Sequence, residues 1–265
     1  LARSRTHAAR LIADGLVTVD GHPTIKSSVR VTARSAVVVA RLDHYVSRAA
    51  HKLIAALDAF DIKIDGCRAL DVGASTGGFT QVLLERGAAE VIALDVGHAQ
   101  LSPSIRSDRR VRVIEGVNAR YLDARHLAAK SGSPEIDQID LVVADLSFIS
   151  LTLVLPAVVR LLKADGHLLM LVKPQFELQP GQIGKGGIVR DAAHFEFVEK
   201  RLRDACAELG IDVLGWMQST IEGGDGNREF FIHGKKSSDV VQDDKPLPAV
   251  PPRKAVKRTP RAETR

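Results

Sequence analysis

A lysine at the end of an apolar run is the residue of this chain best suited to acid–base chemistry. Lys173 follows the run Leu168–Val172 and precedes Pro174, which places its side chain at the mouth of a predicted sheet. Burial and nearby positive charge lower the pKa of a lysine in general, and such a lysine is a usable general base. A stabilising ion pair with Asp145 explains the same spacing equally well, so both interpretations stand.

Further polar residues follow almost every predicted strand. Ligands of open α/β sheets bind outside the carboxyl ends of the strands. The residues at these ends are Asp71, Gly73, Asp95, Asn118 and Asp145. Asp95 lies about 24 residues beyond Asp71, a spacing suited to an acid that binds both ribose hydroxyls of a nucleoside cofactor. Glu229 begins the last predicted strand and could join this cluster, although an isolated glutamate at a strand start is usually just solvated.

The segment Asp71–Phe79 is a glycine-rich turn between a predicted strand and a predicted helix. Gly73, Gly77 and Gly78 give the pattern GxxxGG, which is neither the dinucleotide motif GxGxxG nor the phosphate-binding motif GxxxxGKS/T. Glycines let the backbone approach a ligand, and the start of the helix offers it free N–H groups. An acid and no lysine in this turn suit S-adenosylmethionine, which has a ribose and a carboxylate. The alternative is an ordinary tight turn of an α/β domain.

From residue 66 onward, strands and helices alternate, which is typical of a parallel sheet covered by helices. We expect strands at 68–72, 90–95, 111–115, 139–144 and 167–173, and helices near 79–86, 98–106, 121–130, 151–163 and 191–209. A closing pair of strands, Val213–Met217 and Glu229–His233, flanks a loop that holds Gly223–Asn227. This order predicts an α/β fold of the class I S-adenosylmethionine-dependent methyltransferase type, Rossmann-like with a mostly parallel seven-stranded sheet.

The first forty residues predict a small α+β module with a basic surface. A helix over residues 4–14 ends at Gly15, and strand-like stretches follow at 17–19, 29–31 and 37–39, with a hairpin turn at Asp20-Gly21. Basic residues lie on or beside these elements, namely Arg3, Arg5, Arg10, Lys26 and Arg30. A module this small can form only a small hydrophobic core, so the basic residues on its surface call for a functional explanation.

The segment Tyr45–Phe60 predicts a helix with Ser47 as its N-cap. Its apolar face consists of Leu53, Ala56, Leu57 and Phe60. Lys52 lies beside that face, and its spacing alone favours a surface lysine whose aliphatic stem covers apolar atoms.

Positive charge is concentrated at the two ends of the chain. Residues 1–52 hold nine Lys and Arg against three Asp and Glu, and residues 245–265 hold seven against one, although the net charge of the whole is +5. Basic ends on an acidic body favour a polyanionic partner that meets the ends. We expect residues 235–265 to be a disordered, basic, proline-rich tail, whose charges could also serve solvation alone.

Composition excludes several classes of protein. With 45% hydrophobic residues the chain can bury a core, and two cysteines, Cys67 and Cys206, disfavour a disulfide framework or a cysteine zinc site. We therefore expect a reducing cytoplasm and no metal. The longest uncharged run, Leu146–Val159, contains Pro156 and is shorter than the ~20 residues of a membrane-spanning helix. We expect a soluble protein without a membrane partner.

The pattern SRxxAxxLIxxGxVxVDG, from Ser4 to Gly21, resembles the small RNA-binding domain named after ribosomal protein S-four. The resemblance covers residues 1–40 and lacks the usual first helix of that domain, so we expect a partial domain over residues 1–41. It implies that Arg3, Arg5 and Lys26 contact RNA phosphates, and we add Arg10 and Arg48 as candidate RNA contacts.

Five further segments together resemble the TlyA family of ribosomal RNA cytidine 2′-O-methyltransferases, sometimes labelled haemolysins. They are Ser47–Lys52, Asp71–Phe79, Val143–Ser150, Leu171–Glu177 and Gly226–Phe230. The catalytic domain of that family resembles the FtsJ/RrmJ 2′-O-methyltransferases. On this basis we expect residues 42–65 to be a linker and a helix that carries Lys52, and residues 66–234 to be a methyltransferase domain.

The resemblance implies a catalytic tetrad of Lys52, Asp145, Lys173 and Glu229. It also implies that S-adenosylmethionine binds against Asp71, Gly73, Ala74, Ser75, Gly77, Gly78, Phe79, Asp95, Asn118 and Asp145. In such a site Lys173 takes the proton of a ribose 2′-hydroxyl or stabilises the forming alkoxide, while the two carboxylates orient the ammonium groups. The implied partner is ribosomal RNA or a ribosomal subunit, with one or both ribosomal RNAs as substrates. A monomer is favoured.

Other activities fit the residues less well. Methylation of base amino groups usually accompanies an Asn/Asp-Pro-Pro-aromatic motif, where this chain has Asp145–Phe148, and methylation of pyrimidine carbon-5 needs a cysteine at the site. An oxidoreductase would need GxGxxG. An RNA-binding protein with membrane-lytic, haemolysin-like activity would need a span or an amphipathic stripe, which the sequence does not show. A scaffold with a degenerate enzyme domain would break the tetrad or the glycine turn, and both are intact.

Overall fold

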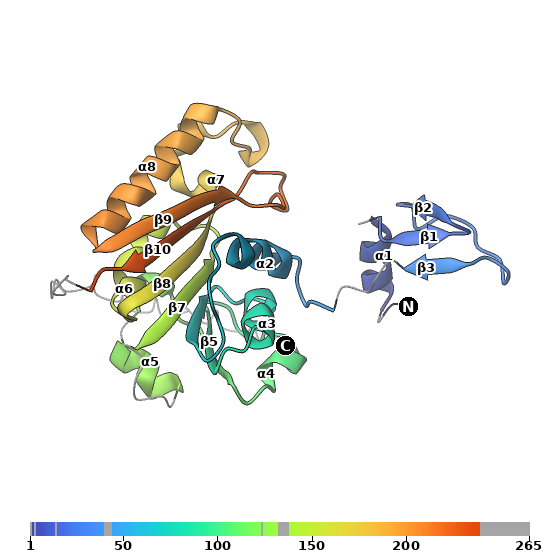
Figure 1. The fold of residues 1–265 in the computed structure, drawn as a ribbon. Helices are drawn as coiled ribbons and strands as arrows, with labels where there is room; N and C mark the ends of the chain where they lie inside the picture. Colours follow the sequence, from blue (N-terminus) through green and yellow to red (C-terminus); the bar gives the residue numbers. More distant parts are fainter. Residues whose placement is uncertain are drawn as a thin grey trace, which may run out of the picture. The chain divides into compact units, whose positions relative to one another are not determined.

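The computed structural model describes residues 2, 4–13, 15–39, 44–122, 124–131 and 138–238. It divides the chain into two compact units, with the division between Tyr45 and Val46 (Figure 1). We had expected the first module to end at residue 41 and residues 42–65 to form a linker and a helix. The helix that carries Lys52, α2 (Ala49–Ala59), instead belongs to the second unit.

The first unit contains one helix and an antiparallel sheet. Helix α1 (Arg5–Ala13) is followed by β1 (Val17–Val19), β2 (His22–Thr24) and β3 (Val37–Val39), which pair in the order β2-β1-β3. The turn Asp20-Gly21 has two positive φ angles, as expected of a hairpin. The strand predicted at 29–31 was wrong. These residues pair with no described strand, and the N–H of Val29 closes a turn onto the carbonyl of Lys26 instead.

The second unit is built on a sheet of seven described strands. They are β4 (Arg68–Val72), β5 (Glu90–Asp95), β6 (Val111–Glu115), β7 (Ile139–Asp145), β8 (Leu162–Val172), β9 (Ile211–Gln218) and β10 (Phe230–Lys236). Their order is β6-β5-β4-β7-β8-β10-β9. Among these strands, β10 alone runs antiparallel to its neighbours. The predicted α/β fold, mostly parallel with a closing hairpin, is confirmed.

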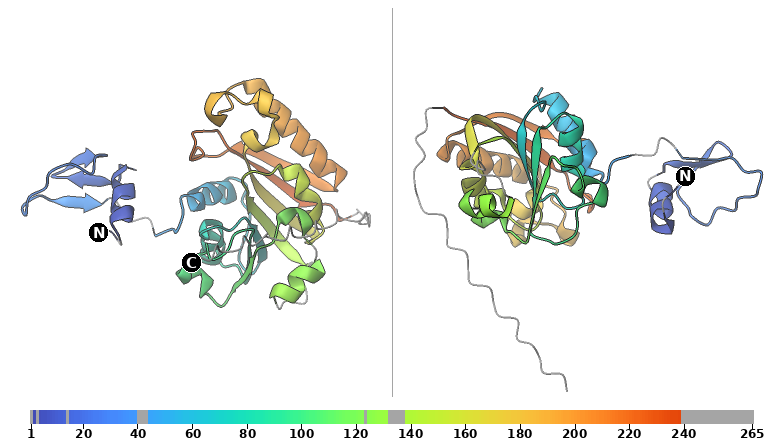
Figure 2. Two further views of the ribbon diagram at one scale, coloured as in Figure 1. Left: turned by 180° about the vertical axis from the view of Figure 1, so that it is seen from behind. Right: turned by 90° about the horizontal axis from the view of Figure 1, so that it is seen from below.

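Helices cover both faces of this sheet (Figure 2). With α2 on one face lie α3 (Gly78–Glu85) and α4 (Pro103–Arg106), and on the other lie α5 (Ala124–Ser131), α6 (Leu155–Val159) and α8 (Ala192–Glu208). The short helix α7 (Pro174–Glu177) follows β8 directly. Between two parallel strands the chain must cross one face of the sheet, and the helices form in these connections.

Two predicted helices are shorter than the sequence pattern suggested. Residues 98–106 form a helix only from Pro103, because Ala99 has a positive φ of 54°. Residues 151–163 divide into a 3₁₀ turn at Leu151–Leu153 and helix α6, and the chain enters β8 at Leu162. Proline near the start of each short helix fixes where the helix begins.

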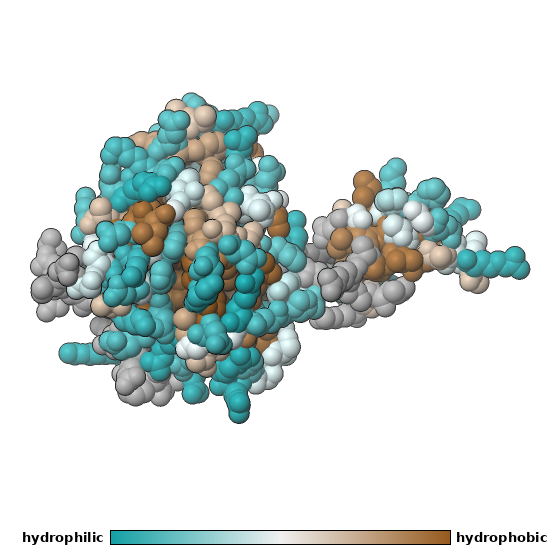
Figure 3. All heavy atoms as spheres, in the orientation of Figure 1, coloured by the Kyte–Doolittle hydropathy of each residue, from teal (hydrophilic) through white to brown (hydrophobic). Residues whose placement is uncertain are grey.

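The core of the second unit lies between the sheet and helices α5, α6 and α8. Alternate residues of the central strands, such as Leu70 and Val72, join this cluster. On the opposite face, the rings of Phe79 of α3 and Phe231 of β10 stack with their centroids 6.4 Å apart. Hydrophilic side chains cover most of the visible surface of this unit, with apolar surface exposed between them (Figure 3).

The last strand continues two residues beyond the domain end predicted at residue 234. Lys236 is buried, and its ammonium donates hydrogen bonds to the carbonyls of Val159 (3.1 Å) and Leu162 (2.6 Å). Burial lowers the pKa of Lys236. These two carbonyls lie where α6 leads into β8, so the end of β10 stabilises the connection between α6 and β8. Lys235 and Lys236, which the sequence assigned to the tail over residues 235–265, thus belong to β10, and residues 239–265 lie outside the described part of the chain.

Two histidines on the paired strands β8 and β10 form a hydrogen-bonded pair, in which His233 is buried and His167 is half-buried. Nδ1 of His167 and Nε2 of His233 lie 3.0 Å apart and share one hydrogen bond, and the ring of His233 also packs against that of Phe60. Burial, and next the neighbouring His167, lower the pKa of His233 from 6.5 to about 4. Protonation of His233 would place a positive charge at a buried position next to His167, so the pair is favoured while it is neutral.

We expect this pair to make the fold acid-sensitive. Between pH 6.5 and 4 the unfolded chain binds a proton at His233 that the folded chain excludes, so the unfolding free energy falls as the pH falls through this window. His233→Phe should reduce that slope in urea unfolding measured at several pH values, whatever its effect at pH 7. An unchanged slope in the variant would contradict this assignment.

Candidate active site

The glycine turn after β4 is held by close backbone contacts. Gly73 has a φ of +86°, and a Cβ there would lie 2.6 Å from the carbonyl oxygen of Asp145. Gly77 has a φ of +97°, and its Cβ would lie 2.8 Å from Cδ1 of Leu101. Both positions require glycine on conformational and steric grounds. The turn therefore packs directly on the end of β7.

The start of α2 packs on the start of α3. A Cβ at Gly78 would lie 2.8 Å from the Cβ of Ser47, so the absence of a side chain permits this contact. Ser47 was predicted as the N-cap of α2, but Arg48 occupies that position and makes no side-chain cap. Oγ of Ser47 nevertheless accepts a hydrogen bond from the N–H of Ala49 (3.1 Å), which satisfies one free donor of the helix start.

A cavity of about 170 Å³ lies between these elements. Six of its lining residues were predicted to bind the cofactor, namely Gly73, Ala74, Ser75, Gly78, Phe79 and Asp145. Lys173 also lines it, together with four residues that the sequence did not single out as site residues, Ser47, Ala49, Thr76 and Ser147. Ser47 and Ser147 belong to the segments Ser47–Lys52 and Val143–Ser150, which were recognised as motifs. Their place beside predicted site residues in these motifs is the signal that could have identified them.

Four residues that were predicted to bind the cofactor, Asp71, Gly77, Asp95 and Asn118, are not among the described residues that line this cavity. Oδ2 of Asp95 accepts a hydrogen bond from the N–H of Ser75 (2.9 Å) and thus ties the glycine turn to the end of β5. Asn118 is exposed, and its Oδ1 accepts from the N–H of Arg120. Asp71 lies beneath the turn with no exposed surface.

Asp71 is a buried carboxyl without a countercharge in contact. Its Oδ2 accepts a hydrogen bond from Oγ1 of Thr80 (2.6 Å), and its Oδ1 has no hydrogen-bond partner among the described residues. Burial raises the pKa of Asp71 to about 7; the hydrogen bond from Thr80 opposes the shift, and the charges of Asp145 and Asp95 add to it. Asp71 supports the turn from below instead of facing the cavity.

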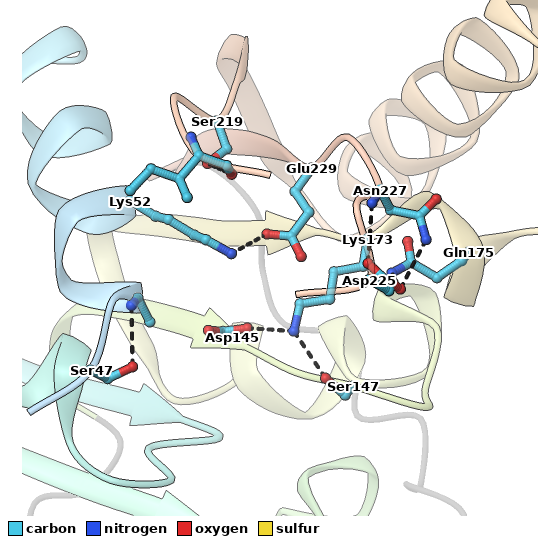
Figure 4. Close-up of polar contacts among 12 residues, drawn as sticks. Ser47, Lys52, Asp145, Ser147, Lys173, Gln175, Ser219, Asp225, Asn227 and Glu229 are labelled. Carbon is cyan, nitrogen blue, oxygen red and sulfur yellow. Dashed lines mark hydrogen bonds and ion pairs between the residues drawn. The ribbon is translucent and has the colours of Figure 1, made fainter. Parts of the chain in front are cut away.

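Lys173 and Asp145 form an ion pair at the cavity wall. Nζ of Lys173 lies 2.7 Å from Oδ1 of Asp145 and donates a hydrogen bond to Oγ of Ser147 (2.9 Å; Figure 4). The lysine follows β8, and the aspartate ends the neighbouring strand β7. The ion-pair interpretation of the sequence is therefore realised, and the ammonium group also faces the cavity.

Lys52 and Glu229 form a second, more deeply buried pair. Nζ of Lys52 donates a hydrogen bond to Oε2 of Glu229 at 2.6 Å (Figure 4). The residues are 8% and 3% exposed, so the spacing-based interpretation of Lys52 as a surface lysine was wrong. Glu229 is likewise buried instead of solvated. Helix α2 carries the lysine across to the start of β10.

The two pairs form one electrostatic cluster. Burial raises the pKa of Glu229, while the hydrogen bond and charge of Lys52 and the charge of Lys173 oppose this shift and the charge of Asp145 adds to it. Glu229 is thus sensitive to both members of the other pair. The structure brings together all four residues of the implied tetrad beside the glycine-lined cavity.

Most of the predicted RNA contacts belong to the first unit, whereas Arg48 lies at the start of α2, four residues before Lys52. Arg5 and Lys26 are exposed in the first unit, and Arg48 is exposed in the second. Arg3 lies outside the described residues, and the side chain of Arg10 is not described although its backbone lies in α1.

A sheet of this order, with a glycine-lined cavity and polar residues at its carboxyl edge, defines a class I methyltransferase fold. Residues 45–236 match the family model described as FtsJ-like methyltransferase. The chain is 46% identical over 255 residues to the 16S/23S rRNA (cytidine-2'-O)-methyltransferase TlyA of Mycobacterium tuberculosis, covering 93% of this chain and 90% of that protein.

Two further relatives carry haemolysin names. The chain is 36% identical to hemolysin A of Brachyspira hyodysenteriae, covering 87% of this chain and 93% of the relative. A solved structure from Streptococcus thermophilus, described as a hemolysin, is 37% identical and superposes with a TM-score of 0.72, covering 91% of this chain and 86% of that one. The chain belongs to the FtsJ-like methyltransferases and, among them, to the TlyA family.

Two other kinds of feature are absent from the described part of the chain. Among the described residues, no helix is long and apolar enough to cross a membrane. The same part of the chain contains no group of three or more His, Cys, Asp or Glu side chains that could hold a metal ion.

We expect Gly73→Ala to weaken binding of S-adenosylhomocysteine by roughly tenfold or more, because left-handed strain costs about 1–3 kcal/mol and the new methyl group meets the carbonyl of Asp145. Calorimetric titration measures this effect. Gly224→Ala is the matched control, since a Cβ at Gly224 meets nothing within 4 Å. Equal affinity in the two variants would contradict the role of the turn.

Proposed function

We propose that the protein transfers a methyl group from S-adenosylmethionine to the 2′-hydroxyl of a cytidine in ribosomal RNA. The observation that carries this proposal is the two lysine–carboxylate ion pairs beside the glycine-lined cavity, one of them buried and the other on the cavity wall. The named activity of the Mycobacterium tuberculosis relative supports the choice of acceptor. The substrate is small- or large-subunit ribosomal RNA, and that relative is named for both.

The residues present fit S-adenosylmethionine. Gly73 and Gly78 let the turn pack closely on the end of β7 and on Ser47, and both glycines and Asp145 line the cavity formed there. In this proposal Asp95, at the end of the neighbouring strand β5, binds the ribose of the cofactor. The cofactor supplies an already activated methyl group on a cationic sulfonium, so much of the rate has to come from positioning the acceptor.

Lys173 is the residue that acts on the acceptor hydroxyl. A ribose hydroxyl is a weak acid, and its oxygen gains negative charge when its proton leaves. An ammonium group at the cavity wall stabilises that charge, and a neutral amine at the same place accepts the proton. Ser147 and Asp145 hold Nζ of Lys173 at that wall.

The other tetrad members set the charge and geometry around Lys173. Lys52 lies within the same cluster and adds positive charge, which favours the alkoxide. Glu229 balances Lys52, and Asp145 balances Lys173, so the cluster has no net charge. A neutral cluster can accommodate a cationic methyl donor, whereas two unpaired lysines would repel it.

The haemolysin names of some relatives suggest membrane lysis as a second candidate. A buried acid–base cluster beside a ligand cavity has no use in lysis. The geometry therefore favours methyl transfer.

We expect Lys173→Ala to reduce methyl transfer to ribosomal subunits that lack the modification by roughly 100-fold or more. The measurement uses methyl-labelled S-adenosylmethionine and nucleoside analysis, with the label expected in 2′-O-methylcytidine. Small and large subunits are assayed separately. The control is Lys200→Ala, which removes an exposed lysine from α8.

Two outcomes would contradict the proposal. Label in a base-methylated nucleoside would exclude the ribose acceptor. Full transfer by Lys173→Ala would exclude its role in the chemistry.

We also expect the first unit to bind RNA through its exposed cations. Arg5→Glu combined with Lys26→Glu should weaken binding to subunits and lower the slope of log affinity against log salt by about 1 for each lost phosphate contact. Fluorescence titration over a salt series measures both quantities, with Lys200→Glu as a control. An unchanged salt slope would show that these residues do not contact phosphates.

A further inference from the structure

The loop between β9 and β10 joins both ion pairs to the surrounding chain. It contains Gly223–Asn227, two residues before Glu229. The N–H of Gly223 donates to the carbonyl of Asn227 (2.9 Å), and the N–H of Ser219 donates to the carbonyl of Glu229 (2.8 Å). A Cβ at Gly223 would lie 2.7 Å from Oε1 of Glu229, so the catalytic carboxylate rests directly on this loop.

Asn227 fixes the loop to a neighbouring segment. The residue is 1% exposed. Its Oδ1 accepts a hydrogen bond from the N–H of Val189, and its Nδ2 donates to the carbonyl of Gly187, each at 2.9 Å. One side chain therefore satisfies two backbone groups of a segment some forty residues earlier in the chain.

The same side chain also connects the loop to the segment that carries Lys173. Nδ2 of Asn227 donates to Oδ2 of Asp225 (2.9 Å), and that oxygen also accepts from Nε2 of Gln175 (3.2 Å), two residues after Lys173 (Figure 4). Burial acts to raise the pKa of Asp225, but the hydrogen bonds from Asn227 and Gln175 outweigh it and lower the pKa. Asp225 is thus a charged acceptor between the two segments.

We propose that Asn227 is a positioning residue for methyl transfer, which holds Glu229 against Lys52 and, through Asp225, fixes this pair relative to Lys173. The proposal rests on the proposed function. Asn227 itself touches neither ion pair. Its effect on the reaction is transmitted through the loop that supports Glu229.

The test is a double-mutant cycle between Asn227→Ala and Glu229→Ala in the full chain. In the wild-type background, Asn227→Ala should lower kcat on unmodified ribosomal subunits by about 10- to 100-fold, as expected of a displaced catalytic group. The dissociation constant of S-adenosylhomocysteine should change by less than about 2-fold. In the Glu229→Ala background, the same substitution should cost less than about 2-fold, because the group that it positions is gone.

Two variants make the cycle specific. Ser219→Ala removes a buried hydroxyl of the same loop that bonds only to Ile221 in the described structure, and should lower kcat much less than Asn227→Ala. Glu229→Gln provides the same cycle with a side chain of equal size if Glu229→Ala does not fold. A loss from Asn227→Ala that is equal in both backgrounds would overturn the proposal.

Measurements of unfolding test the positioning role of Asn227 independently of methyltransferase activity. Urea unfolding of the wild type, the two single variants and the double variant should show that Asn227 and Glu229 are coupled. The unfolding constant of the double variant should differ by roughly 3-fold or more from the value that independent effects of the two substitutions would give. If the wild type transfers no label to subunits but this coupling persists, the proposed function fails and the positioning role stands. Independent effects on unfolding would remove the positioning role, even with an active enzyme.

Discussion

The structure of the site depends on the cost of burying charge. The buried charges of Lys52 and Glu229 would each be strongly destabilising without their partner, and Lys173 and Asp145 form a second, partly exposed pair beside them. Lys52 reaches Glu229 across 177 residues of sequence, and Lys173 reaches back to Asp145 on the adjacent strand. The requirement for pairing therefore determines how α2, β7, β8 and β10 meet. The Lys52–Glu229 contact also fixes α2, which in turn packs on the glycine turn through Ser47.

The sequence predicted the sheet well because each strand carries its own local signal. Apolar runs, glycine turns and a polar residue at each strand end are short-range patterns, and they predicted the succession of strands along the chain and the edge at which ligands would bind. The same patterns predicted residues of the glycine turn, such as Gly73 and Phe79, that line the cavity. The resemblance to a family was needed to join residues that no local pattern connects.

Features that depend on tertiary contacts could not be predicted in this way. Spacing made Lys52 a surface lysine, because its partner is far away in sequence. Asp71 looked like a ligand contact, yet it lies below the turn, since residue alternation in β4 directs it toward Thr80. The valines at 29–31 have strand propensity but pair with no strand among the described residues. Lys236 looked like the start of a charged tail, but two backbone carbonyls accept its hydrogen bonds inside the unit.

The direction of β10 has a consequence for how such a site can diversify. Because β10 runs against its neighbours, its first residue, and not its last, reaches the edge where the parallel strands end. The hairpin loop before it therefore borders the reaction centre, while both of its ends are anchored in the sheet. Changes at exposed positions of this loop, such as Glu222 and Gly224, can reshape the rim of the site without altering the contacts of Asn227 or the parallel strands that carry Asp145 and Lys173. Variation confined to such positions can change acceptor choice while the methyl-transfer apparatus is retained.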